Sequence, residues 1–303
     1  MELIKISYLD IGKFTLEDNE IVAIGKFDGI HLGHHTLIDK LIEIGNELNM
    51  KKAILTFSPT PEEFFSKSYR GVLMGLNEKM NYLKKMGIDY LYVLKFDEHI
   101  AKMKPEAFFS TFLKPFWGVV CGKDFRFGHN NEGDSLKLLE YNPHTFIVPK
   151  FKIDGVRVSS DLIKTELQKG NIMEANKLLA KRFTLKGKVV TGMGLGRKLG
   201  IPTANLLLKE NYAKLKHGVY ICFAKIDHNS YYGLMNYGVA PTFTDGSEVK
   251  VEIHFLDYVG DIYKKELDVE LVDFLREEEK FTSEEAFKQQ LIKDLEEARK
   301  RWK

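Results

Sequence analysis

Short apolar runs alternate with helical patterns through the first half of the chain, and this rhythm constrains the fold more than any other feature. The runs are IVAIGKF (21–27), KAILTF (52–57), YLYVLKF (90–96), WGVVCG (117–122) and TFIVP (145–149). Helical patterns lie between them, near residues 34–48, 77–86 and 105–113. Because parallel strands are joined by helical crossovers, the alternation predicts an α/β domain, with a parallel sheet covered by helices on both faces.

The pattern changes after Asp161. Two helical segments, LIKTELQKG and NIMEANKLLAKR, are separated by Gly170, a natural helix stop. From Phe183 onward, strand-like segments alternate with turn residues, which predicts a small antiparallel β-barrel. A terminal amphipathic helix follows, with Ser283 as its expected N-cap and bases in its last turns. We therefore predict two domains, residues 1–182 and 183–303.

Charge and cysteine usage narrow the class of protein. The 303 residues include 45 Lys and Arg against 43 Asp and Glu, a net charge of +2, and like charges form no dense block. No stretch of 18 residues lacks charge, and acids appear early in the chain, so neither a membrane span nor an export signal is expected. Cys121 and Cys222 lie in apolar runs without metal-ligand spacing. These features predict a cytoplasmic protein that binds neither nucleic acid nor membrane.

Two histidines follow the run at 21–27. His31 and His34 are expected at the start of a helix, with Gly29 and Gly33 beside them. Helix N-termini expose free amides and a positive dipole end, glycines let a phosphate approach the backbone, and imidazoles donate to phosphate oxygens. For His-x-Gly-His alone, a polar turn explains the residues equally well. Its position after a strand of a parallel sheet, where such sheets bind ligands, favours a nucleotide site.

The segment GKFDGIHLGH (25–34) resembles the ATP-binding motif of the nucleotidyltransferase superfamily, in the form found in prokaryotic bifunctional riboflavin kinase/FAD synthetases. TFSPTPEEFF (56–65), GKDFRFG (122–128) and VSSDLIK (158–164) are similar to further motifs of that family, in the same order. The resemblance implies a Rossmann-like nucleotidyltransferase domain that adenylylates FMN, with His31 and His34 as catalytic residues. The residues implied to bind ATP or its phosphates are Gly25, Phe27, Asp28, Gly29, Gly33, Ser159, Ser160 and Lys164. Those implied to bind the flavin are Pro59, Pro61, Phe64, Asp124, Phe125 and Phe127.

This first site departs from the family pattern at three positions. Asp161 and Lys164 stand where the family has Thr and Arg, and Asn131 replaces a frequent basic residue. Asp161 suits the first turn of a helix, where carboxylates are favoured, and Lys164 keeps the positive charge without the bidentate geometry of Arg. For any one of the phenylalanines, packing in the core is the more common role. These departures leave open the possibility that this first site is inactive.

A second constellation lies in the predicted barrel, in VVTGMGLGRKLGIPTANL (189–206). The segment Leu199–Pro202 interrupts the helix that a dinucleotide-binding glycine motif requires. A glycine loop still offers amides to phosphates, and Thr203 and Asn205 place oxygen ligands on one side of an extended segment, as Mg²⁺ prefers. On their own, Thr and Asn at this spacing are more often part of a turn.

This segment resembles the GxxxGRxLGxPTAN signature of riboflavin kinases, and MNYGVAPTF (235–243), VEIHFLDYVGDIY (251–263) and LREEEKF (275–281) are similar to further motifs of the family. The resemblance implies a riboflavin kinase barrel. In it Gly194, Gly196, Arg197 and Thr203 bind ATP, Thr203 and Asn205 bind Mg²⁺, Glu252 is the base that activates the ribityl 5′-hydroxyl, and Arg276 contacts flavin. Without the resemblance, Glu252 is explained equally well as an exposed acid. His254 either orients substrate or packs, and Lys264 stands where relatives often have Gly.

Together the two resemblances imply an enzyme of flavin cofactor synthesis. It would phosphorylate riboflavin to FMN with ATP and then adenylylate FMN with a second ATP, giving FAD and pyrophosphate, with Mg²⁺ as cofactor. One alternative is a chain with a single active site. A second is a nucleic-acid-binding protein, because His-x-Gly-His also occurs in aminoacyl-tRNA synthetases and the chain ends in ARKRWK. The near-neutral net charge disfavours that alternative.

Overall fold

The computed structural model describes residues 1–303 except 11–13, 17–18, 192–201, 241–247, 280 and 302–303. The chain forms two compact units, one of residues 1–69 and 74–160 and one of residues 70–73 and 161–303. Helices α7 (Ser160–Lys169) and α8 (Ile172–Leu179) pack with the second unit, where the Asn176 side chain donates to the Leu271 carbonyl. A domain boundary after residue 182 stays a prediction, because this packing does not decide which activity the two helices serve.

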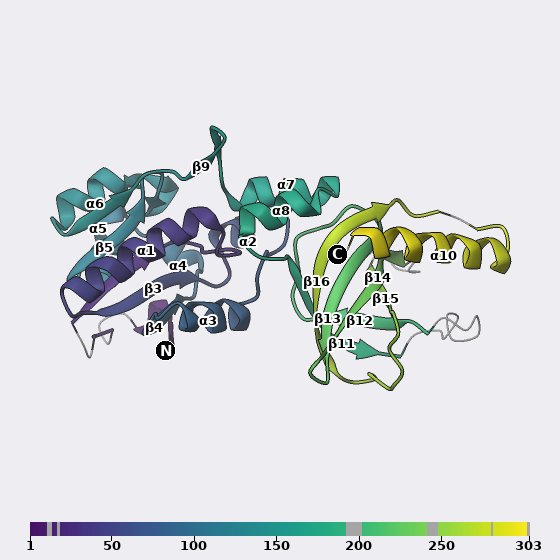
Figure 1. The fold of residues 1–303 in the computed structure, drawn as a ribbon. Coiled ribbons are helices and arrows are strands. Elements are labelled where there is room, and N and C mark those ends of the chain that lie inside the picture. The colour runs from purple at the N-terminus through teal and green to yellow at the C-terminus, as the bar shows by residue number, and fades with distance from the viewer. Residues whose placement is uncertain (11–13, 17–18, 192–201, 241–247, 280, 302–303) are drawn as a thin grey trace. The chain divides into compact units, whose positions relative to one another are not determined.

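The first unit contains a six-stranded sheet in the order β1-β4-β3-β2-β5-β8 (Figure 1). All neighbouring strands are parallel, which confirms the predicted α/β class. The strands are β1 (Glu2–Ile6), β2 (Glu20–Ile24), β3 (Lys51–Phe57), β4 (Tyr90–Leu94), β5 (Gly118–Gly122) and β8 (Thr145–Val148). Strand β1 was not predicted, because it is an edge strand whose two charged residues interrupt the apolar run.

Two hydrophobic cores lie on opposite faces of this sheet. Ile21 and Ala23 of β2 pack with α1 (Leu32–Glu47) and α3 (Leu76–Lys85). Val22 and Ile24 pack on the other face, with the segment formed by α5 (Pro105–Phe108) and the π-helical turn η2 (Phe109–Leu113) and with α6 (Ser135–Tyr141). Strands buried on both faces read as continuous apolar runs, which is why the sequence located them.

Strand β2 lies where the strand order reverses. The chain leaves β2 toward β3 and β4 on one side, and β5 and β8 occupy the other side. Ligands of open α/β sheets bind outside the carboxyl ends of the strands at such a switch point. The loops that follow β2 and β5 carry the motifs GKFDGIHLGH and GKDFRFG, so the fold brings these two segments to one edge of the sheet.

The second unit contains a closed barrel in the order β11-β12-β15-β14-β13-β16 (Figure 1). All neighbouring strands are antiparallel, as predicted. The strands are β11 (Thr184–Val190), β12 (Ala204–Leu208), β13 (Gly218–Ile226), β14 (Asn229–Ala240), β15 (Glu248–Phe255) and β16 (Glu266–Arg276). Closure leaves no free sheet edge. Strand β12 was not predicted, because the preceding Gly- and Pro-containing segment suggests a loop.

Helix α10 (Glu284–Arg301) follows the barrel. The Ser283 hydroxyl accepts a hydrogen bond from the Ala286 amide at 3.1 Å, which confirms the predicted N-cap. Gly170 (φ 84°) follows the last residue of α7, as expected of a helix stop. Cys121 and Cys222 are buried free thiols in β5 and β13, which confirms their place in the core.

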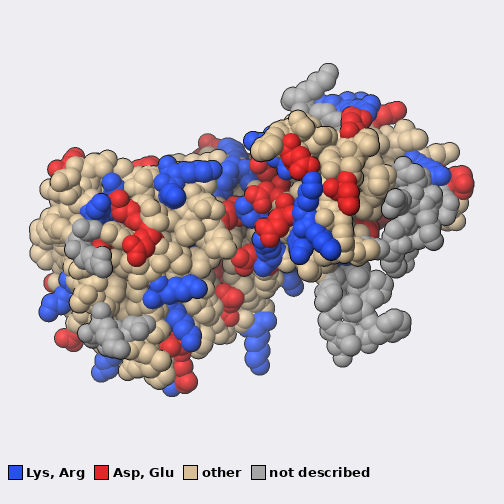
Figure 2. Space-filling model, turned by 90° about the horizontal axis from the view of Figure 1, so that it is seen from below, with Lys and Arg blue, Asp and Glu red and all other residues tan. Residues whose placement is uncertain are grey.

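The surface carries charges of both signs. On the face shown in Figure 2, Lys and Arg side chains are interspersed with Asp and Glu side chains on both parts of the chain. Among the described residues, no helix has the length and apolar character needed to cross a membrane.

Candidate functional sites

The turn after β2 holds its residues in conformations that side chains rarely adopt. Phe27 (φ 47°) and Ile30 (φ 44°) have left-handed backbones, as does Gly29 (φ 83°). Both Phe27 and Ile30 are fully buried, so packing maintains the strain. The turn ends at His31, the N-cap residue of α1, whose side chain makes no capping hydrogen bond. The amides at the start of this helix are therefore not capped by a side chain, as an anion site requires.

His31 and His34 form a stacked pair. Their ring centroids lie 3.7 Å apart with an interplanar angle of 19°. Burial lowers the pKa of His31 to about 4 and that of His34 well below its usual range. The Nδ1 atom of each ring is buried, and within the described part of the chain it has no hydrogen-bond partner. Two neutral imidazoles with unused ring nitrogens suit a polar ligand, because a buried polar atom without a partner is costly.

The VSSDLIK segment contacts this turn. The Ser160 hydroxyl donates to the Asp28 carbonyl at 3.0 Å. A Cβ on Gly33 would lie 3.1 Å from the His31 ring and 3.3 Å from the Val158 carbonyl oxygen, so a side chain here would crowd both the histidine and the 158–160 segment. The segments 25–34 and 158–160, which are more than a hundred positions apart in the sequence, therefore pack against each other.

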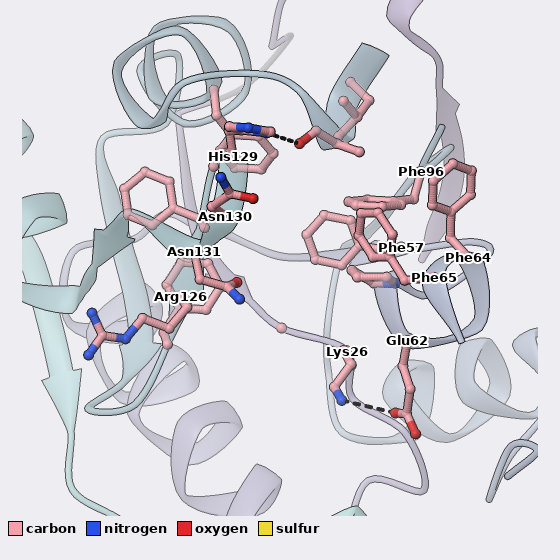
Figure 3. Close-up of a pocket in the computed structure, with 18 of the residues that line it drawn as sticks. Lys26, Phe57, Glu62, Phe64, Phe65, Phe96, Arg126, His129, Asn130 and Asn131 are labelled. Carbon is pink, nitrogen blue, oxygen red and sulfur yellow. Dashed lines mark hydrogen bonds and ion pairs between the residues drawn. The ribbon is translucent and has the colours of Figure 1, made fainter. Parts of the chain in front are cut away.

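A cavity of about 950 Å³ opens beside this turn, where Gly25 and Lys26 line it. Its aromatic wall consists of Phe57, Phe64, Phe65, Phe96, Phe108, Phe125 and Phe127. Figure 3 shows Phe57, Phe64, Phe65 and Phe96 gathered on one side of the cavity. Phe125 and Phe127 stack at 5.6 Å on a two-residue spacing, as an extended segment predicts. A wall of this kind suits a planar aromatic ligand.

Helix α2 (Pro61–Phe65) supplies the most exposed aromatic side chains of this wall. Thr60 and Glu63 form a capping box and Pro61 begins the helix, so the local sequence itself specifies this short element. Phe64 and Phe65 remain 41% and 67% exposed, although their rings lie 5.5 and 5.8 Å from that of Phe96. Large aromatic side chains exposed beside a cavity indicate a binding surface.

The polar side of the cavity carries paired charges. The Lys26 ammonium lies 3.3 Å from the Glu62 carboxylate (Figure 3), and the Arg157 guanidinium pairs with Asp124. Arg126 pairs with Asp134 at 3.2 Å, and in Figure 3 its guanidinium is directed away from the four labelled phenylalanines. Lys26, Glu62 and Arg157 were not predicted as site residues, because only the fold brings them to one cavity.

The predicted flavin residues fall into two groups. Pro61, Phe64, Asp124, Phe125 and Phe127 line the cavity, whereas Pro59 precedes α2 and does not. Asn131 (φ 59°) lines the cavity in the loop after Phe127.

Two residues of the predicted phosphate-binding turn, Asp161 and Lys164, differ in their exposure. Asp161 is exposed in the first turn of α7, where the helix dipole favours a carboxylate. Lys164 is buried in α7 within the second unit, and its assignment to the phosphate site stays a prediction.

The second unit has a cavity of its own, of about 460 Å³. Thr203, Glu252 and Arg276, predicted from three separate motifs, all line it. In the barrel, Glu252 pairs with Asn205 of β12 on one side and with Asn236 of β14 on the other. Asn205 therefore lies beside Glu252 in the barrel, although it does not itself line the cavity. Helix α10 contributes Phe287, Leu291 and Asp294 to the lining of the cavity, and the sequence did not suggest these three residues.

Glu252 is accessible but not free in solvent. Its side chain is 29% exposed, and its carboxylate lies 2.8 Å from the Lys250 ammonium. A half-enclosed, charge-paired carboxylate between two asparagines differs from an ordinary surface acid. A carboxylate that lines a cavity can accept a proton from a bound ligand.

His254 and Arg276 are both bound by neighbouring groups. The Nδ1 atom of His254 lies 2.9 Å from the Pro202 carbonyl oxygen, and since a carbonyl only accepts, Nδ1 carries the hydrogen. His254 therefore holds the backbone just before Thr203. Arg276 donates from Nε and Nη2 to Asp294 and from Nη1 to the Glu277 carbonyl, so its guanidinium is already paired.

Thr203 and Glu252 at the cavity, with Asn205 beside Glu252 in the barrel, offer donor atoms that fit Mg²⁺. Thr203 offers a hydroxyl, Asn205 an amide oxygen and Glu252 a carboxylate, which are the hard oxygen ligands this ion prefers. The described residues hold no cluster of three or more His, Cys, Asp or Glu side chains suited to a metal. The predicted phosphate ligands Gly194, Gly196 and Arg197 lie outside the described residues.

Comparisons with known proteins match both units. A family model described as FAD synthetase matches residues 14–162, and one described as riboflavin kinase matches residues 179–302. A bifunctional riboflavin kinase/FMN adenylyltransferase of Listeria monocytogenes is 33% identical, over 93% of this chain and 92% of the relative. The protein of the same description from Escherichia coli K12 is 34% identical, over 90% of each. A crystal structure described as a macrolide-efflux protein from Streptococcus pneumoniae superimposes with a TM-score of 0.89 at 29% identity, covering 98% of this chain and 99% of that one. This chain belongs to the family of bifunctional riboflavin kinase/FMN adenylyltransferases.

Proposed function

We propose that this chain makes FAD from riboflavin in two ATP-dependent reactions, each in its own cavity. The barrel transfers the γ-phosphoryl group of ATP to riboflavin and releases FMN and ADP. The α/β unit transfers the adenylyl group of a second ATP to FMN and releases FAD and pyrophosphate. The observation that supports this division is that each unit has a separate cavity lined by residues of its own motifs.

In the kinase reaction we assign Glu252 the role of general base. Its carboxylate takes the proton of the ribityl 5′-hydroxyl while the hydroxyl oxygen bonds to the γ-phosphorus and the bond to ADP breaks. Thr203 and Asn205 would hold Mg²⁺, which neutralises phosphate charge when bound. His254 fixes the Thr203 segment through the Pro202 carbonyl. General bases of this kind contribute roughly 10² to 10⁴ in rate.

In the adenylyl transfer no base is required, because the attacking FMN phosphate is already ionised. A phosphate oxygen of FMN bonds to the α-phosphorus of ATP, and the bond to pyrophosphate breaks. We assign the ATP phosphates to the amides at the start of α1, to His31 and His34 as neutral donors, and to the turn at Ser159 and Ser160. The flavin ring would lie against the phenylalanine wall. Alignment and charge stabilisation then account for catalysis.

The free thiols of Cys121 and Cys222 suit a reducing compartment, so we expect a cytoplasmic enzyme. Nucleic acid has no role in this proposal, and the interspersed charges in Figure 2 agree with that.

Product analysis tests the function directly. The purified protein is incubated with ATP and Mg²⁺ and with either riboflavin or FMN, and the flavins are separated by chromatography. We expect FMN and then FAD from riboflavin, and FAD with pyrophosphate from FMN. Conversion that stops at FMN would leave a riboflavin kinase alone, and salt-sensitive RNA binding without flavin conversion would favour the nucleic-acid alternative.

A further inference from the structure

Lys79 is a buried lysine that neither reaction has used so far. It lies on α3, is 6% exposed, and donates from its ammonium to the Lys26 carbonyl oxygen at 2.9 Å. The hydroxyl of Thr56, a fully buried residue at the end of β3, donates to the same oxygen at 2.9 Å. One backbone carbonyl thus receives two buried donors from two different elements. Lysines are rarely buried unless a specific partner holds them.

The carbonyl that Lys79 holds belongs to the strained turn. Lys26 directly precedes Phe27, whose backbone is left-handed (φ 47°), and the turn continues to His31. The Phe27 ring lies 5.2 Å from the His34 ring. Fixing the Lys26 carbonyl fixes the peptide plane at which the turn begins. Strained backbone persists only where its surroundings determine it, and Lys79 and Thr56 are two such determinants.

Lys79 also brings a charge to the inner side of the anion site. Burial lowers its pKa to about 8, and the neighbouring Asp28 carboxylate opposes this effect. Lys79 in turn contributes to the lowered pKa of His34, together with His31, Lys26 and His35. At pH 7 the ammonium is therefore mostly charged. A buried cation acts on a nearby phosphate more strongly than an exposed one, because water screens it less.

We propose that Lys79 is a positioning residue of the adenylyl-transfer site, which both fixes the turn that presents His31 and His34 and supplies buried positive charge for the polyphosphate of ATP. This inference rests on the proposed adenylyltransferase function. It assigns Lys79 no contact with substrate.

Three variants separate the two effects. Lys79→Met removes the charge and the hydrogen bond, Lys79→Arg keeps a permanent charge, and Thr56→Val removes the other hydrogen bond to the same carbonyl without changing charge. FAD formation from FMN and ATP is measured as kcat and KM for ATP. We expect Lys79→Met to lower kcat/KM by about ten- to a hundred-fold, the usual effect of losing a hydrogen bond to a charged group. FMN formation from riboflavin, measured on the same samples, should stay unchanged and serves as the internal control.

The pH dependence distinguishes charge from mere structural support. Binding of inorganic pyrophosphate is measured by calorimetry at pH 7, 8 and 9 for the wild type, Thr56→Val and Lys79→Arg. Pyrophosphate itself titrates in this range. At each pH, the affinity of each protein is therefore divided by the affinity of Lys79→Arg, and the titration of pyrophosphate cancels in this ratio. We expect the ratio for the wild type to fall between pH 7 and 9, by at most about tenfold, because Lys79, whose pKa burial lowers to about 8, loses its proton over this range. Thr56→Val should show the same fall.

The outcomes are decisive even where a variant folds poorly. If Lys79→Met binds pyrophosphate and turns over as the wild type does, the inference is wrong. If Lys79→Met is unfolded, Lys79→Gln takes its place, because it removes the charge and keeps a hydrogen-bond donor. Pyrophosphate binding and FAD formation by Lys79→Gln equal to those of the wild type would then refute the inference. A wild type that makes no FAD from FMN refutes the proposed function instead, while the pyrophosphate titrations still decide the role of Lys79.

Discussion

The guanidinium of Arg276, at the end of β16, is held by the carboxylate of Asp294 on α10, at 2.9 Å from Nε and 2.8 Å from Nη2. The Asp294 side chain is only 4% exposed, and Gln290 donates to it as well, at 2.9 Å. Both charged residues line the cavity of the barrel. The pair therefore fastens the terminal helix to the barrel at the kinase site.

Breaking this pair should destabilise the barrel. Asp294→Ala leaves the partly buried Arg276 guanidinium without its carboxylate partner, so the free energy of unfolding is expected to fall by about 2 to 3 kcal/mol. Urea denaturation followed by circular dichroism measures the change. Glu297→Ala is the matched control on the same helix, since Glu297 pairs with Arg301 on the exposed side, and it should change little. Equal effects of the two substitutions would contradict the structural role of the Arg276–Asp294 pair.

Separate loss of the two activities is the second prediction. Glu252→Ala should lower FMN formation by about 10² to 10⁴ and leave FAD formation from supplied FMN intact, because Glu252 acts only as the kinase base. His31→Ala should impair FAD formation chiefly and leave FMN formation intact. Each variant is the control of the other, in assays with riboflavin or FMN as the flavin. Parallel losses of both activities in either variant would disprove the division of labour.

The fold was largely predictable because its pattern is strong. The central strands β2, β3, β4 and β5 are buried on both faces and so read as apolar runs, while β1 was missed because an edge strand needs no such run. Strand β12 was missed because its residues follow a glycine-rich segment. In both cases the strand is defined by its neighbours and not by its own sequence.

The site was predictable only where a motif carries it. Thr203, Glu252 and the phenylalanine motifs were found in advance, and the structure places them on two cavities. Lys79 and Asp294 could not be found, because a lysine or aspartate on an amphipathic helix looks like a surface residue. Only the packing of α3 on the sheet and of α10 on the barrel shows them to be buried.

The third prediction concerns His254. Its Nδ1 donates to the Pro202 carbonyl, so His254→Leu should release the segment that carries Thr203 and raise the KM for ATP in FMN formation about tenfold, the effect of one lost hydrogen bond of about 1.4 kcal/mol. His254→Asn, which keeps a donor on a shorter side chain, should recover part of the loss. FAD formation from FMN serves as the control. An unchanged KM for ATP in His254→Leu would show that the contact does not position the segment.

The fourth prediction follows from the buried histidines. The pKa of His31 is lowered to about 4 in the folded state, against about 6.5 when unfolded, so below pH 6.5 the unfolded chain binds a proton that the folded chain does not. The stabilising effect of keeping His31 neutral is therefore fully present above pH 6.5. As the pH falls toward 4, the free energy of unfolding decreases by about 3 kcal/mol from His31 alone. Calorimetric melting at pH 7, 5.5 and 4.5 measures this. In His31→Gln the loss should be smaller, and identical pH profiles of the two proteins would refute the assignment.

The final prediction concerns Lys264, the position at which the resemblance to riboflavin kinase motifs leads us to expect glycine. Its backbone is left-handed (φ 66°), and its amide donates to the Val189 carbonyl at 3.0 Å, so the turn keeps the conformation that glycine favours. Lys264→Gly should therefore raise the free energy of unfolding by about 0.5 to 1 kcal/mol, as the relief of the left-handed strain exceeds the added freedom of the unfolded chain. Lys264→Ala is the matched control, because it removes the same side chain but keeps the Cβ that causes the strain. Urea denaturation should show a gain for Lys264→Gly over Lys264→Ala, and a glycine variant no more stable than the alanine variant would mean that the turn is not strained.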